Sequence, residues 1–210
     1  MRNALGIAVV LLAGCTGTST PGPSGAEQLA VVPPSEAPTA QTLGGAYAAY
    51  ALTPASGERQ RAYFHTFPDD YATLRNLFGF EEVGEDSVAF GQYYEQGNDM
   101  IGAFFKLDSL PAQDIAAKAI GIARNGVWQA DGVGYFQHFL MKHFEGTPTT
   151  YLGILKSSAR GDQAGFWKFY ADGPEAFPQE DKARLRGLLA NEPGQLAVLD
   201  SVLAMQPLGH

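Results

Sequence analysis

Apolar residues recur at helical spacing over most of the chain. The clearest example is the segment 128–144, in which Val133, Phe136 and Leu140 fall on one face of a helix. β-branched residues alternating with polar ones, the pattern typical of strands, are nearly absent after residue 46. All nine tyrosines, thirteen phenylalanines and two tryptophans lie in that same part of the chain. The pattern therefore predicts a single all-α domain over residues 46–210.

Prolines divide this domain into helices, because the first turn of a helix tolerates the missing N–H of proline. Helices are expected to begin near the prolines at 68, 111, 148, 178 and 193, with further helical runs over 92–106, 128–144 and 162–171. The entrances at 111, 148 and 178 are 37 and 30 residues apart, with another helix inside each interval. That spacing is typical of stacked helical hairpins, but no shared residue signature accompanies it. An irregular helical bundle and a short solenoid-like stack both remain open.

Composition narrows the possible partners. The chain of 210 residues is 45% hydrophobic and 17% charged, with a formal net charge of −8. A nucleic-acid partner requires clustered Lys and Arg over phosphates, so none is expected. The chain has one cysteine and therefore no intramolecular disulfide, so the domain must be held by its core. No metal-binding or cofactor-binding motif occurs, and neither a metal nor a cofactor is expected.

The N-terminus has the layout of an export signal. Arg2 precedes an uncharged apolar run over Ala4–Leu12, and two small residues then lead to Cys15. The run is much shorter than the ~20 apolar residues that a membrane-spanning helix needs. It is therefore expected to be a signal peptide and not a transmembrane segment.

Residues 12–15 read Leu-Ala-Gly-Cys and resemble the lipobox of bacterial lipoproteins. The resemblance implies that signal peptidase II removes residues 1–14 and that lipid on Cys15 attaches the mature protein to a membrane. Thr16 follows the cysteine, and under the sorting rule of enteric lipoproteins a residue other than aspartate implies the outer membrane. Which face of that membrane carries the protein stays open. Beyond the lipobox, the domain resembles uncharacterised helical bacterial lipoproteins.

Residues 15–45 are expected to be the lipidated cysteine followed by a flexible tether. After Cys15 this stretch is rich in proline, glycine, serine and threonine, with two charged residues and no aromatic one. Such a composition buries too little apolar surface to offset the entropy of ordering.

Two groups of residues are candidates for a functional site. Asp131 and His138 share a polar stripe of one predicted helix, and with His65 they could serve an envelope hydrolase. Two helical turns place Asp131 and His138 about 10 Å apart along the axis, too far for a direct hydrogen bond. The hydrolase therefore requires all three to converge in one cleft. Because no motif of a known hydrolase is present, an enzyme is not the favoured interpretation.

The second group is a cluster of aromatic residues at Phe166, Trp167, Phe169 and Tyr170. Consecutive aromatic residues on a helix are either buried on two sides or line an exposed groove, and we name these four as the candidate contact surface. The favoured function is a membrane-anchored lipoprotein that binds a protein partner. The alternatives are the hydrolase and a lipoprotein that neutralises a toxin through an acidic concave surface.

Overall fold

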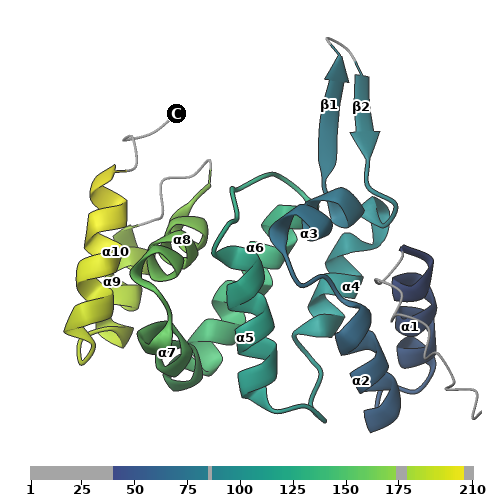
Figure 1. Ribbon diagram of the computed structural model, residues 1–210, viewed down its shortest axis with the longest axis horizontal. Coiled ribbons are helices and arrows are strands. Elements are labelled where there is room, and N and C mark those ends of the chain that lie inside the picture. The colour runs from purple at the N-terminus through teal and green to yellow at the C-terminus, as the bar shows by residue number, and fades with distance from the viewer. Residues whose placement is uncertain (1–39, 85–86, 174–178, 206–210) are drawn as a thin grey trace, which may run out of the picture. The chain divides into compact units, whose positions relative to one another are not determined.

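The computed structural model describes residues 40–84, 87–173 and 179–205, which all belong to one unit of the chain. Helices dominate this unit, so the predicted all-α class is confirmed (Figure 1). In chain order the elements are α1 (Ala40–Leu52), α2 (Gly57–Thr66), α3 (Tyr71–Phe78), β1 (Phe80–Gly84), β2 (Ser87–Phe90), the 3-10 turn η1 (Tyr94–Gln96), α4 (Gly97–Phe104), α5 (Ala112–Ala123), α6 (Gly132–Gly146), α7 (Pro148–Ser157), α8 (Arg160–Ala171), α9 (Gln179–Leu188) and α10 (Pro193–Met205).

The helices stack as helical hairpins, one of the two arrangements that the proline spacing allowed. Helix α4 packs against α6, α5 against α7, α6 against α8, and α8 against α10. Contact between a helix and the next but one, as in these four pairs, is typical of a solenoid, in which each hairpin buries the apolar face of its neighbour. In Figure 1 the helices follow one another in chain order, from purple α1 to yellow α10.

Proline and acidic caps set the helix starts as expected. Pro148 and Pro193 are the first residues of α7 and α10, and Pro111 caps α5. Helix α3 begins later than Pro68, because the Asp70 carboxylate accepts a hydrogen bond of 2.9 Å from the Thr73 backbone N–H. A cap of this kind satisfies one of the N–H groups that a helix start leaves without an intrahelical partner.

The core begins earlier in the chain than the sequence predicted. Helix α1 starts at Ala40, and Leu43 is buried in the hydrophobic core although it falls in the stretch predicted as a tether. The predicted boundary at residue 46 is therefore wrong. The glycines and alanines of this segment give a weak apolar pattern, so the helix was not predicted. Its few larger side chains, such as Tyr50, face the core.

The hairpin of β1 and β2 is the one departure from the all-α prediction among the described residues. Phe80 lies opposite Phe90, and Glu82 lies opposite Val88 in the antiparallel ladder. Every described residue of the two strands is exposed except Phe80, which is half-buried. Figure 1 shows the hairpin standing clear of the helices. Because neither face is buried, the sequence does not show the alternation by which a half-buried strand is recognised.

The predicted signal peptide, Cys15 and most of the predicted tether lie outside the described residues. Across residues 40–84, 87–173 and 179–205, no helix combines the length and the apolar character that crossing a bilayer requires.

Candidate functional site

The aromatic cluster on α8 is part of the core. Phe166, Trp167 and Phe169 are fully buried, and Tyr170 is 2% exposed. The reason is that α8 is enclosed by α5, α6, α7 and α10, so that rings on several sides of the helix all point inward. The prediction that these four residues form a contact surface is therefore wrong.

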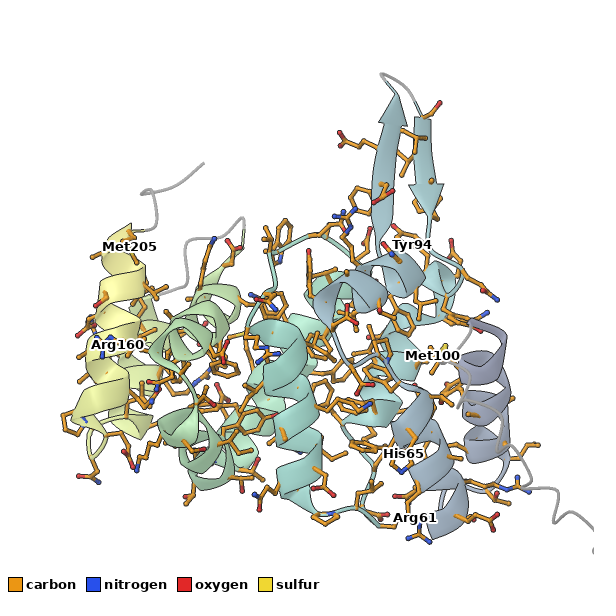
Figure 2. All side chains as sticks on the ribbon, viewed as in Figure 1. Arg61, His65, Tyr94, Met100, Arg160 and Met205 are labelled. Carbon is orange, nitrogen blue, oxygen red and sulfur yellow. The ribbon has the colours of Figure 1, made fainter. Side chains whose placement is uncertain are left out.

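The three residues proposed for a hydrolase do not form one site. His65 is exposed on α2, whereas Asp131 accepts a hydrogen bond from the Tyr94 hydroxyl at the other end of the helices (Figure 2). His138 is exposed on α6, where partial burial and the Lys142 ammonium lower its pKa. The convergence that the hydrolase required is absent from the described part of the chain. There, no group of three or more His, Cys, Asp or Glu residues is arranged to hold a metal ion.

Exposed apolar residues lie mainly on the hairpin and around the start of α6. Seven large apolar side chains are exposed among the described residues, and five of them lie on the hairpin or around the start of α6. These five are Val83, Val88, Phe90, Val127 and Tyr135. The other two, Leu52 and Met205, are the last residues of α1 and α10. We call the five residues together with Tyr94 the hairpin surface.

Specific contacts join the parts of the hairpin surface. The Phe90 and Tyr94 rings lie 4.5 Å apart between centroids. On the side of α6, the Gln129 side-chain amide donates a hydrogen bond of 2.7 Å to the Phe80 carbonyl of β1. The Tyr71 hydroxyl donates one of 2.7 Å to the Val127 carbonyl in the loop before α6. The base of the hairpin, η1 and this loop are thus held together by side chains.

Asp131, which accepts a hydrogen bond from Tyr94 of the hairpin surface, has an unusual backbone conformation. Its φ of 59° is the only positive φ of a non-glycine residue among the described residues. Such a conformation costs on the order of 1–3 kcal/mol and persists only where surrounding contacts hold it. Asp131 precedes α6 without capping it, because its carboxylate accepts the hydrogen bond of the Tyr94 hydroxyl.

The same contact changes the acidity of Tyr94. The hydrogen bond to the Asp131 carboxylate, together with desolvation and the nearby negative charge, raises the pKa of Tyr94 to about 12. The hydroxyl is therefore protonated at neutral pH and remains the donor. This bond ties the 3-10 turn after β2 to the start of α6, so the hairpin stands on a defined base.

The sequence around the hairpin is strongly acidic. Between Arg75 and Lys106 the chain has no basic residue, and it has six acidic ones: Glu81, Glu82, Glu85, Asp86, Glu95 and Asp99. Arg75 forms an ion pair with Glu81 at the edge of this segment. The formal net charge of the whole chain is −8, so this segment accounts for most of the excess of acidic over basic residues. This run of acids without a base is the sequence signal from which the surface could have been found.

A second feature is a shallow depression of about 420 Å³ between α5 and α7. It is lined by uncharged residues: Gln113, Thr149, Thr150, Gly153, Ile154 and Ser157. Its walls offer hydroxyl and amide groups but no titratable side chain, so they provide neither a general base nor a charged anchor for a ligand.

No protein family, curated protein or solved structure matches this chain. Its function is therefore inferred from the side chains and contacts described above.

Proposed function

We propose that this chain is a lipid-anchored lipoprotein of the outer membrane whose helical domain binds a protein partner through the hairpin surface. The observation that carries the binding proposal is that, among the described residues, five of the seven exposed large apolar side chains lie on the hairpin or around the start of α6, segments that hydrogen bonds join. Single exposed apolar residues are normal on a protein surface, whereas several in one part of it are typical of an interaction site. Aromatic residues such as Phe90 and Tyr94 are also enriched at the centres of protein interfaces.

The anchor rests on the lipobox that ends at Cys15. Lipidation requires the thiol of that cysteine, so Cys15→Ser is expected to abolish incorporation of labelled palmitate in a bacterial host. The variant should also accumulate as the uncleaved precursor, which is detected as a slower band on a gel. A variant that is labelled and processed like the wild type contradicts the anchor.

Site-specific crosslinking in intact envelopes tests the binding proposal. A photoreactive residue at Val88, on the hairpin surface, is compared with the same residue at Lys168, which is exposed on α8. We expect a discrete adduct from position 88 and none of the same mass from position 168. Absence of an adduct at 88, or the same adduct from both positions, contradicts binding through the hairpin surface.

A further inference from the structure

The ladder of the hairpin determines which backbone groups face outward. The Gly91 N–H donates a hydrogen bond of 2.9 Å to the Gly79 carbonyl, so these two opposed residues form a hydrogen-bonded pair. In an antiparallel ladder hydrogen-bonded and non-hydrogen-bonded pairs alternate. Phe90 and Val88 therefore belong to non-hydrogen-bonded pairs. Both residues direct their backbone N–H and C=O groups away from β1.

The two outer edges of the hairpin differ. On the β1 edge the Phe80 carbonyl already accepts a hydrogen bond from Gln129. On the β2 edge, the backbone groups of Val88 and Phe90 make no hydrogen bond beyond the hairpin within residues 40–84, 87–173 and 179–205. An open strand edge is a template for another strand, and a hairpin of only two strands gains stability from a third.

Charge determines what can occupy this edge. The segment 76–105, which contains the hairpin, has six acidic residues and no basic one, so an incoming segment meets a negative field. A second copy would bring the same six acids to the contact. The N-terminal stretch 16–39 of this chain brings two more acids and no base. Charge complementarity instead favours a segment that carries Lys or Arg.

We propose that the partner presents an extended, Lys- or Arg-containing segment that adds to the outer edge of β2 as a third strand. Its backbone pairs with the outward groups of Val88 and Phe90, while its cations face the carboxylates of the hairpin. This mode of recognition takes affinity from backbone hydrogen bonds and specificity from alternate side chains. The inference rests on the proposed function, because it names the partner of the same surface.

A matched pair of substitutions tests the edge. Val88→Pro removes the outward N–H without removing a bond of the hairpin ladder, and proline is tolerated on edge strands. Val88→Thr keeps both the N–H and the β-branched shape. The probe is a fluorescent octapeptide of alternating Lys and Val, titrated into the full lipidated chain in detergent. We expect binding to weaken about tenfold in Val88→Pro and to change less than about twofold in Val88→Thr.

Two further peptides test the same contact on the wild-type chain, independently of how the variants fold. Methylation of alternate backbone nitrogens removes the donors along one edge of the octapeptide and is expected to abolish binding. An octapeptide of alternating Glu and Val should not bind. Glu82→Lys should weaken binding of the Lys–Val peptide, and added salt should weaken it further.

Equal binding of the methylated and unmethylated peptides, or of the Glu–Val and Lys–Val peptides, overturns the inference. So does a Val88→Pro variant that loses only self-association, because the occupant of the edge is then a second copy. Phe90→Pro removes the other outward N–H of the same strand edge. If the adduct at position 88 forms equally with Phe90 and with Phe90→Pro, the proposed function stands and strand addition fails. If no adduct forms at position 88, the proposed function itself fails.

Discussion

Buried glutamines fasten segments that are far apart in the sequence. Gln60, Gln137 and Gln195 are the polar side chains buried among the described residues, and each one is hydrogen-bonded. The Gln137 amide on α6 donates to the Phe169 carbonyl at 2.6 Å and to the Asp172 carbonyl at 2.7 Å. It thereby satisfies two carbonyls at the end of α8, where intrahelical donors run out.

Gln137→Leu is expected to destabilise the domain by about 1–3 kcal/mol, because it removes the donor of the Asp172 carbonyl and leaves the Phe169 carbonyl only the longer bond from the Asp172 N–H. Urea unfolding followed by circular dichroism measures the loss. His138→Ala, at the exposed neighbouring position on α6, is the control and should change stability by less than about 0.5 kcal/mol. Equal effects of the two substitutions would show that Gln137 is not a fastening residue.

His143 makes stability depend on pH. It is half-buried, its Nδ1 lies 2.9 Å from the Tyr151 hydroxyl, and desolvation lowers its pKa. The unfolded chain, with a His pKa of about 6.5, then binds more protons than the folded chain. The stabilisation is present above pH 6.5 and is lost as the pH falls through the lower pKa of the folded state.

The expected outcome is that the urea midpoint falls more between pH 7.5 and pH 5 in the wild type than in His143→Asn, which does not titrate. His138 has a pKa lowered in the same direction and adds a second part of the effect. An identical fall in the wild type and in a variant with both histidines replaced contradicts this origin.

At the scale of the element, α8 approaches α5 closely at a glycine. A Cβ added to Gly165 would lie 1.9 Å from the Arg124 carbonyl oxygen, whereas one added to Gly161 on the same helix meets nothing within 4 Å. Gly165→Ala is therefore expected to destabilise the domain by about 1–3 kcal/mol. Gly161→Ala should instead stabilise it, by up to about 1 kcal/mol. Thermal unfolding of the two variants measures both signs, and a stabilising Gly165→Ala would rule out the close contact.

Helices were predictable from sequence where proline and apolar spacing agree. Pro111, Pro148 and Pro193 fix the starts of α5, α7 and α10, because their rings suit a first turn and nothing deeper. Helix α1 was missed because its glycines and alanines give a weak apolar pattern, although a few side chains such as Leu43 and Tyr50 reach the core. Spacing identifies a face only where that face carries large side chains.

The candidate site was not predictable from the same pattern. Whether the rings of Phe166 and Trp167 face a groove or a neighbour depends on α10, which packs on α8 from later in the chain. Conversely, Val88 and Phe90 are exposed although their residue types suggest burial. The sequence shows only the excess of acidic residues around the hairpin. It does not show how these residues are arranged in space.

At the scale of the whole molecule, the hairpin is separable from the core. Replacing residues 82–88 by Asn-Gly joins the hydrogen-bonded pair Glu81 and Ala89 through a two-residue type I′ turn. Because the described residues removed are all exposed, the free energy of unfolding should change by less than about 1 kcal/mol. The same variant, with its photoreactive residue moved to Ala89, should lose the crosslinked partner. A large loss of stability would show that the hairpin supports the fold.

The stacking of α4 on α6, α5 on α7, α6 on α8 and α8 on α10 also favours an order of assembly. Helix α4 finds α6 within a few tens of residues, and α8 finds α10 after a similar interval. Contacts between segments close in sequence need only short loops to close, which favours fast folding. A chain that emerges N-terminus first can therefore bury the apolar face of each helix soon after that helix appears. Little apolar surface stays exposed until a helix distant in sequence is made. For the exported lipoprotein proposed above, which would cross a membrane before it folds, such growth from one end would limit aggregation on arrival.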